Sequence, residues 1–167
     1  MLTLEQLALR CADPLLGLLR HVPFSVQRWV LQAAVQRLFA EPLEEGAFDL
    51  LSGRWLRLEV SDLNLAWCLT RTPLGLRMAS AAPVDVSIRG NWREFVLLAS
   101  RQEDPDTLFF RRRLLIEGDT ELGLGMKNLL DSLDPDTMPP ALWRSLCRLG
   151  QALSAEQRSA QAGGAGI

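Results

Sequence analysis

The sequence has few of the residues on which catalytic and metal sites depend. Its 167 residues include one histidine and no tyrosine. His21 stands beside Pro23 with no acidic or cysteine residue at ligand spacing, so we expect it at the surface or at a helix end. The signatures of serine hydrolases, zinc proteases and phosphate-binding loops are missing from the chain. These absences predict a protein that is not an enzyme and that carries no metal or cofactor.

Cysteine is equally sparse. Cys11, Cys68 and Cys147 are widely separated, odd in number, and form no Cys-x-x-Cys pair. A disulfide framework or a zinc site is therefore not expected, and we interpret the cysteines as small buried hydrophobic residues in a reducing compartment.

Long apolar runs and a strong net charge are also missing. No window reaches the ~18 uncharged apolar residues of a membrane span, and charged residues interrupt the N-terminal segment where a signal peptide would have its apolar core. The formal net charge of −2 does not favour nucleic-acid binding. We expect a cytoplasmic protein, with peripheral contact at the inner membrane as an alternative.

Two amphipathic helices are predicted before the first strand, over residues 3–20 and 24–40. The second has Val30 and Val35 on its apolar face and Gln32 on the opposite face. Across both helices, arginines outnumber acidic residues by four to two. Such helices cover a domain or pair with a second copy, or they lie on an anionic membrane. The first interpretation is favoured because most amphipathic helices contribute to cores.

Four short segments that alternate apolar and polar residues follow an acidic segment. They lie at residues 54–60, 63–69, 74–78 and 84–88. The short links between consecutive strands predict an antiparallel meander with one apolar face. Asn91 is then expected to cap a helix that continues to about Arg101.

The stretch 106–134 contains the most informative pattern in the chain. After two adjacent phenylalanines, residues 111–117 alternate as a strand. We interpret the arginines that open this strand as solvated or as paired with Glu117 and Asp119. A second interpretation places one of them at the mouth of a cavity, beside an anionic head group.

Within the same stretch, Asp119 is expected to cap an amphipathic helix that continues to about Leu133. Gly123 and Gly125 interrupt its first two turns. Each glycine costs about 1 kcal/mol relative to alanine in a helix interior. We therefore predict that the backbone of this helix approaches a neighbouring strand or a bound chain closely.

A last helix is predicted over residues 140–153. The whole pattern favours an α+β fold in which a sheet of about five mainly antiparallel strands is covered by helices, with two extra helices at the N-terminus. We expect three parts along the chain: the amphipathic helices at 1–40, the main domain at 41–153, and a disordered tail at 154–167.

The sequence FFRRRLLIEGDTELGLGMKNLLDSL resembles the closing motif of sterol-carrier-protein type 2 domains. That motif combines paired aromatic residues, a strand ending in Ile-x-Gly, and an apolar helix with glycine and lysine. Residues 53–67 and 102–134 are also similar to the bacterial accessory factors of ubiquinone biosynthesis that contain such a domain. The resemblance extends over nearly the whole chain.

This resemblance implies a lipid-binding fold with a hydrophobic tunnel between the sheet and its helices. It also implies a non-enzymatic role in the oxygen-independent branch of ubiquinone synthesis. In that role the protein would present an isoprenoid quinone intermediate or a phospholipid, together with peptidase-U32-like hydroxylase partners.

The residues expected to line this tunnel are apolar side chains of the sheet and of the segments that cover it. They are Leu65, Trp67, Leu76, Met78, Val86, Ile88, Phe95, Phe109, Phe110, Leu122, Met126 and Leu130. The same pattern would also produce a filled core, because protein interiors pack densely. The alternative function is therefore a structural or interaction module that dimerises or docks on partners through its N-terminal helices, without a ligand.

Overall fold

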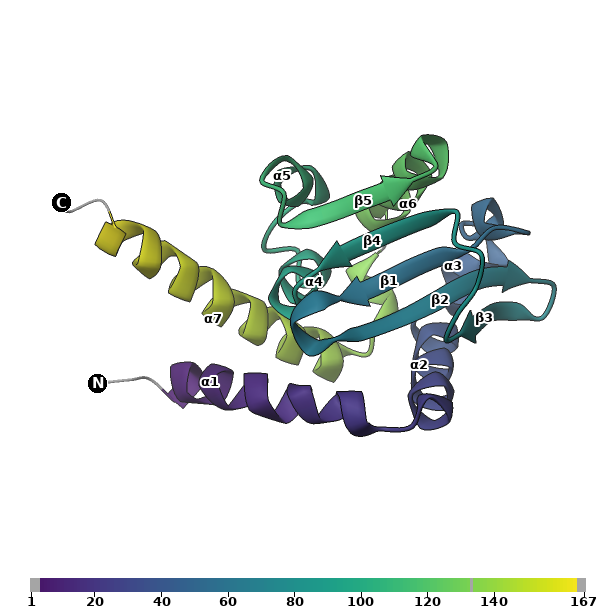
Figure 1. The fold of residues 1–167 in the computed structure, drawn as a ribbon. Helices are drawn as coiled ribbons and strands as arrows, with labels where there is room; N and C mark the ends of the chain where they lie inside the picture. The colour runs from purple at the N-terminus through teal and green to yellow at the C-terminus, as the bar shows by residue number, and fades with distance from the viewer. Residues whose placement is uncertain (1–3, 133, 165–167) are drawn as a thin grey trace.

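Helices cover one face of a five-stranded sheet in the computed structural model, which describes residues 4–132 and 134–164 (Figure 1). The α-helices are α1 (Leu4–Gly17), α2 (Phe24–Leu38), α3 (Ala40–Glu44), α4 (Trp92–Ala99), α5 (Pro105–Phe110), α6 (Thr120–Ser132) and α7 (Pro140–Gly164). The 3-10 helices are η1 (Leu18–His21), η2 (Asp49–Leu51), η3 (Ser61–Leu63) and η4 (Pro135–Thr137). Leu133, the expected end of the helix that begins after Asp119, lies outside the described residues, as does the last part of the expected tail.

The strands form one mixed sheet. They are β1 (Leu56–Val60), β2 (Leu65–Thr72), β3 (Gly75–Ala79), β4 (Val86–Gly90) and β5 (Leu114–Gly118), in the order β3-β2-β1-β4-β5. Neighbouring strands are antiparallel except β1 and β4, which run parallel. The predicted α+β fold with a mainly antiparallel five-stranded sheet is confirmed. The prediction that the first four strands form a consecutive meander is wrong, because β4 lies beside β1.

Hydrogen bonds around Trp55 fix the start of β4 beside β1. The Trp55 carbonyl accepts the backbone N–H of Asp85 at 2.9 Å and that of Val86 at 3.2 Å. The Trp55 N–H in turn donates to the Asp85 carboxylate at 2.7 Å. The link from β3 to β4 therefore carries the chain back past two strands instead of forming a hairpin. This leaves β3 and β5 as the edges of the sheet.

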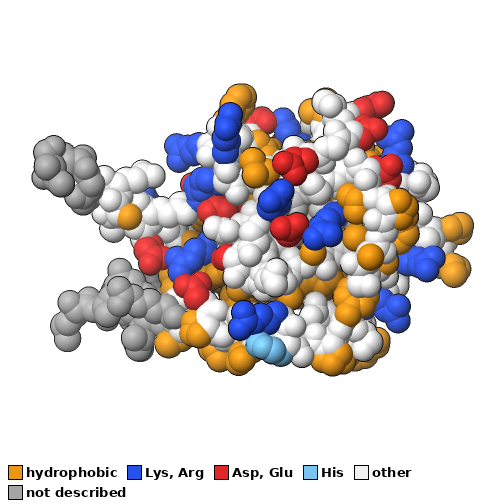
Figure 2. All heavy atoms as spheres, viewed as in Figure 1, with side chains coloured by type: hydrophobic (Ala, Val, Ile, Leu, Met, Phe, Trp, Pro, Cys, Tyr) orange, Lys and Arg blue, Asp and Glu red, His pale blue; other side chains and the backbone are white. Residues whose placement is uncertain are grey.

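The sheet has one apolar face and one charged face, as the alternation predicted. Leu56, Leu76 and Ile88 form the main core with residues of α2, α3 and α6; in Figure 1, α3 and α6 lie behind the sheet and α2 lies below it. On the other face Glu59 lies near Arg57 and Arg89, and Figure 2 shows basic and acidic side chains interspersed over the strands. Any interior site therefore lies on the helical side of the sheet.

α2 lies along the β3 edge and directs polar side chains toward the sheet. Gln32 Nε2 donates a hydrogen bond to the Leu76 carbonyl at 3.2 Å, and Gln27 Oε1 accepts one from Trp67 Nε1 at 3.0 Å. Val30 is 51% exposed. The predicted orientation of Val30 and Gln32 is therefore wrong. Glutamine satisfies carbonyl and indole groups that an apolar side chain would leave unpaired.

A second core joins the two ends of the chain. Its buried residues are Leu9, Leu63, Leu65, Trp92, Leu97 and Leu153. α1 and α7 run side by side next to it (Figure 1). Because α7 continues to Gly164, the disorder expected from Ser154 is wrong for the described part of the tail. Residues 155–162 are mostly good helix formers, and Glu156 forms an ion pair with Arg93 at 2.7 Å.

The two predicted helix caps have different outcomes. At α6 the prediction is confirmed, since Asp119 Oδ1 accepts a hydrogen bond from the Leu122 N–H at 2.8 Å. At α4, Asn91 occupies the N-cap position as predicted, but its side chain makes no capping hydrogen bond, and the Trp92 N–H donates instead to Asp62 Oδ1 at 3.1 Å. The α4 cap thus comes from the turn after β1, which fixes that helix to the sheet.

The three consecutive arginines lie in a turn and not on a strand. α5 ends at Phe110, Arg112 has a left-handed φ of 55°, and β5 begins only at Leu114. The predicted strand therefore starts later than expected. The turn allows neighbouring arginines to point in unrelated directions.

Arg113 lies between two carboxylates. Its Nη2 is 2.6 Å from Glu94 Oε2, and its Nη1 is 2.8 Å from Glu103 Oε2. Burial raises the pKa of Glu94 above its ordinary value, while the ion pair with Arg113 acts in the opposite direction. The predicted pairing of Arg113 with Glu117 or Asp119 is wrong, since its partners come from α4 and the loop after it.

Replacing Arg113 by methionine is expected to lower the free energy of unfolding by about 3 kcal/mol, because two largely buried carboxylates lose their counter-ion. Without Arg113 the pKa of Glu94 rises further, so the folded state binds a proton more readily than the unfolded chain. The loss is therefore largest at neutral pH and shrinks as the pH falls toward 4.5. Urea unfolding across this pH range measures it. The exposed Arg111→Met is the control, and an equal loss there would contradict the assignment.

Candidate lipid-binding cavity

An apolar cavity of about 170 Å³ lies between the sheet and the helices that cover it. Its walls are Val35, Phe39, Phe48, Leu51, Leu56, Leu58, Leu69, Leu76, Ile88, Phe95, Leu98, Met126, Leu129 and Leu130. Every one of these side chains is hydrophobic. We call this space the inner cavity; it lies within the main core, where an apolar chain would be shielded from water.

A second space of about 230 Å³ adjoins the inner cavity. The two share four wall residues, Phe39, Phe95, Leu98 and Leu130. The rest of this outer compartment is lined by Ala99, Arg101, Pro135, Met138 and Trp143. The shared residues therefore form the boundary, which we call the neck, between an interior space and one bounded by the loop before α7.

Arg101 supplies the charge at the rim of the outer compartment. It follows α4 with a left-handed φ of 55°, and its Nη2 donates to the Asp131 carbonyl near the end of α6 at 3.1 Å. It therefore links the two helices that flank this compartment. Within the described residues, no group of three or more histidine, cysteine, aspartate and glutamate side chains is placed to hold a metal ion.

Five residues expected at the tunnel lie together in the wall of the inner cavity. They are Leu76, Ile88, Phe95, Met126 and Leu130. Leu76 and Ile88 come from the apolar face of the sheet, and the others come from α4 and α6. The structure thus brings together residues from four elements that are far apart in the sequence.

The other expected residues lie elsewhere. Val86 and Leu122 are buried in the main core without lining the cavity, and Met78 is also buried. Leu65 belongs to the second core, against which Trp67 packs. These residues lie on the apolar face of the sheet or of α6, but neighbouring side chains pack against them and leave no open space beside them.

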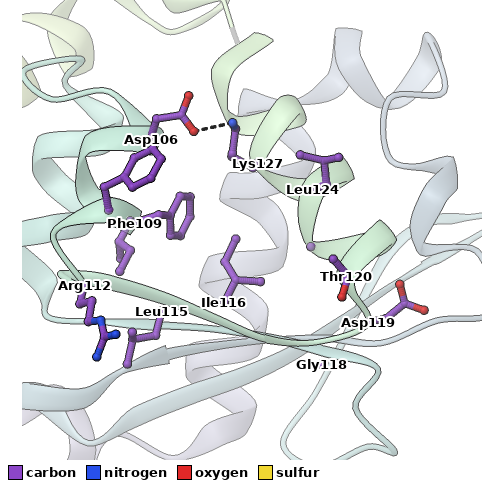
Figure 3. A pocket seen from close by; sticks show the side chains of 13 residues that line it. Asp106, Phe109, Arg112, Leu115, Ile116, Gly118, Asp119, Thr120, Leu124 and Lys127 are labelled. Atoms are coloured by element: carbon purple, nitrogen blue, oxygen red, sulfur yellow. Dashed lines mark hydrogen bonds and ion pairs between the residues drawn. The ribbon is translucent and has the colours of Figure 1, made fainter.

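Phe109 and Phe110 line a different hollow, an open groove of about 550 Å³ between α5, β5 and α6. Phe110 is 88% exposed. In Figure 3, Ile116 projects from β5 toward α6, Leu115 lies on the other side of the strand, and Lys127 reaches Asp106 in an ion pair. This outer groove borders the edge strand and is separate from the inner cavity.

Three of the wall residues that sequence reasoning missed, Phe39, Phe48 and Leu51, come from the segment between α2 and β1. Phe39 and Phe48 meet edge to face, with ring centroids 5.9 Å apart. This segment has no regular period, so its apolar residues could not be assigned to a face. Leu56, Leu58 and Leu69 had a usable signal, because they share the alternation that identified Leu76 and Ile88.

Gly123 allows α6 to lie against the sheet, as its position inside the helix predicted. A Cβ at Gly123 would stand 2.7 Å from Ile116 Cγ2, whereas one at Gly125 would meet Leu50 Cδ1 at 3.4 Å, an ordinary contact. The close approach is therefore confirmed at Gly123, on the β5 side of the helix.

The two glycines provide a matched pair of substitutions. Both gain about 1 kcal/mol of helix propensity on change to alanine. Only Gly123→Ala is also expected to suffer overpacking, which costs about 1–3 kcal/mol. Thermal unfolding should therefore show Gly123→Ala to be less stable than Gly125→Ala by that amount, and equal stabilities would contradict the close packing of α6 on β5.

Comparison with known proteins gives consistent matches. The model of the SCP-2 sterol transfer family matches residues 31–131. The ubiquinone biosynthesis accessory factor UbiT of Escherichia coli, from strain K12 and from O157:H7, is 40% identical over 138 residues, which are 83% of this chain and 79% of the relative. The solved structure of UbiJ-SCP2 ubiquinone synthesis protein has a TM-score of 0.54 at 20% identity and covers 67% of this chain and 100% of that one.

The family match includes most of the elements that enclose the inner cavity. Residues 31–131 run from the middle of α2 through the whole sheet to the last turn of α6. The structural match supports the fold, and the sequence match to the Escherichia coli relatives extends over most of both chains. The chain therefore belongs to the SCP-2 sterol transfer family, in its ubiquinone biosynthesis accessory factor branch.

Proposed function

We propose that the protein is a lipid-binding accessory factor of ubiquinone biosynthesis. It holds an isoprenoid quinone intermediate or a phospholipid and acts, without catalysis of its own, in the oxygen-independent branch of the pathway. The wholly apolar wall of the inner cavity carries this proposal. Membership of the family and the name of the Escherichia coli relatives support it.

An apolar chain is the kind of ligand that suits the inner cavity. Each methylene group that leaves water for such a site contributes about 0.8 kcal/mol. The inner cavity of about 170 Å³ is small compared with ligand pockets of roughly 300–1,000 Å³. A prenyl or acyl chain would therefore pass the neck and occupy the outer compartment as well. Its polar end would then lie near Arg101.

This arrangement suits presentation of a ligand. With the tail inside and the ring or head group at the rim, the reactive end remains within reach of another protein. Peptidase-U32-like hydroxylases are the proposed partners, because they would act on the exposed ring. The Arg101 guanidinium can hydrogen-bond an anionic or carbonyl oxygen of the ligand at that rim.

The test is to identify what occupies freshly purified protein. Gentle purification followed by native mass spectrometry and lipid extraction is expected to show a bound prenylated aromatic compound or a phospholipid. A mass equal to that of the bare chain, together with no uptake of added ubiquinone intermediate or phospholipid, would overturn the proposal.

A structural or interaction module is the second candidate. It is favoured by the exposed hydrophobic residues at the end of α1 and on α2. In this case the protein would associate through these helices while its interior takes up no ligand. Sedimentation velocity, combined with the lipid analysis above, distinguishes the two: a dimer without lipid would favour the module.

A further inference from the structure

Large hydrophobic side chains are exposed together where α1 leads through η1 into α2. Leu15 is 63% exposed, Leu18 59% and Trp29 74%. With three further exposed residues they form what we call the η1–α2 surface: Leu15, Leu18, Leu19, Val26, Trp29 and Val30. Figure 2 shows hydrophobic side chains along the lower edge of the molecule, where Figure 1 places the end of α1 and α2.

The spacing of these residues places each group of three on one side of its helical segment. Val26, Trp29 and Val30 stand at positions i, i+3 and i+4 of α2 and therefore share one helix face. Leu15, Leu18 and Leu19 repeat the same spacing across the end of α1 and η1. Single exposed hydrophobic residues are ordinary on a soluble protein. A cluster at helical spacing indicates a contact surface.

α2 has exposed apolar side chains on its outer face in addition to those on its inner face. Its glutamines, Gln27 and Gln32, hydrogen-bond Trp67 and the Leu76 carbonyl of the sheet. Trp29 and Val30, which would ordinarily cover a core, point outward instead. The sheet therefore does not account for the outward apolar face of α2, which is available to a second apolar surface.

The charged side chains within the segment that carries this surface have one sign. Residues 14–40 contain Arg20, Arg28 and Arg37 but no aspartate or glutamate, although the whole chain has a net charge of −2. Each basic residue near an anionic membrane contributes about 1 kcal/mol of attraction. Tryptophan is also enriched at the level of lipid head groups. Basic charge and exposed tryptophan thus occur together on these two helices.

We propose that the η1–α2 surface docks on a phospholipid bilayer that contains anionic lipids. A second copy of the chain fits this surface less well, because a twofold contact would bring a segment with only basic residues against itself. An anionic bilayer is complementary to this surface in charge and in polarity. Its head groups pair with the arginines, and the boundary of its acyl region receives the hydrophobic face.

The docking helix is also a wall of the inner cavity. Val35, on the inward side of α2, lines that cavity while Trp29 and Val30 face outward. Docking would therefore place the cavity wall directly against the bilayer from which a lipid is taken. The docking itself does not depend on the cavity's being occupied, so the two proposals can fail separately.

Co-sedimentation with vesicles tests the docking. Wild-type protein is expected to bind vesicles of phosphatidylcholine mixed with phosphatidylglycerol, to bind phosphatidylcholine alone weakly, and to lose binding as salt is added. Trp29→Glu should weaken binding to the anionic vesicles at least about tenfold. Arg20→Glu combined with Arg28→Glu should weaken it and reduce its dependence on salt.

Matched controls make the result decisive. Leu74→Glu changes an exposed hydrophobic residue away from this surface, 95% exposed, and should bind vesicles as the wild type does. Leu130→Trp, which fills the neck of the cavity, should also retain vesicle binding, so failure of lipid storage can be told apart from failure of docking. Unchanged binding by Trp29→Glu, an equal loss in Leu74→Glu, or a dimer that Trp29→Glu dissociates would overturn the proposal.

Discussion

Met126→Glu is expected to abolish lipid uptake in a protein that still folds. Met126 is 2% exposed and lines the inner cavity from α6. A carboxylate in this apolar space would cost several kcal/mol or take up a proton at neutral pH. Either form leaves a polar group and its water where the ligand chain would lie. Native mass spectrometry with added phospholipid or ubiquinone analogue measures uptake, and circular dichroism checks the fold.

Leu124→Glu is the matched control for this substitution. It makes a similar change on the same helix two residues earlier, but Leu124 is 56% exposed and lines the outer groove. Uptake should be unchanged. Should Leu124→Glu abolish uptake while Met126→Glu does not, the ligand would lie in the outer groove and the cavity assignment would be wrong.

A second cavity variant keeps the test valid if Met126→Glu fails to fold. Leu130→Trp adds volume at the neck shared by the inner cavity and the outer compartment. Overpacking of this kind costs about 1–3 kcal/mol, which a folded domain usually tolerates. This variant should fold and take up little lipid. Normal uptake would show that the ligand chain does not pass the neck.

The faces of the sheet could be predicted from sequence because side chains alternate strictly along a strand. This alternation places Leu56, Leu76 and Ile88 on one face, and the structure shows that face covered. The order of the strands could not be predicted in the same way. It depends on the contact of Trp55 with Asp85, thirty residues apart, and no local pattern reports such a pairing.

The inner cavity shows the same division between local and non-local information. Met126 and Leu130 could be found because α6 has a clear apolar period. Val35 and Phe39 could not, since α2 directs glutamines to the sheet and hydrophobic residues outward. Where a helix has an apolar surface on both sides, periodicity alone does not identify the side that faces the core.

The paired phenylalanines show the limit of a motif. Their resemblance to the family motif identified the fold correctly, yet the structure places Phe109 and Phe110 on α5, beside the outer groove. A family motif identifies the elements that follow one another along the chain. It does not establish which of their side chains reach the interior, because that depends on how each helix is placed and rotated against the sheet.

Trp92→Ala is expected to lower the free energy of unfolding by about 3–5 kcal/mol, the cost of removing a large buried aromatic side chain. Trp92 is 6% exposed within the second core. Its Nε1 donates to Asp13 Oδ1 at 2.9 Å, and the Arg93 guanidinium lies 5.3 Å from its ring centroid. Urea unfolding measures the loss. Trp29→Ala is the control, and a change within about 0.5 kcal/mol is expected for it because that ring is largely exposed.

The same variant also tests whether the ends of the chain belong to the main domain. Arg93 joins α1 and α7 through ion pairs with Asp13 at 3.0 Å and Glu156 at 2.7 Å, directly beside Trp92. If the second core is shared, Trp92→Ala should expose α1 to limited proteolysis before the sheet unfolds. If residues 1–40 form a separate unit, α1 should be cleaved equally in wild type and variant. Equal cleavage would therefore support the separation of residues 1–40 from the main domain that the sequence predicts. Faster cleavage in the variant would show that α1 belongs to the same cooperative unit as the sheet.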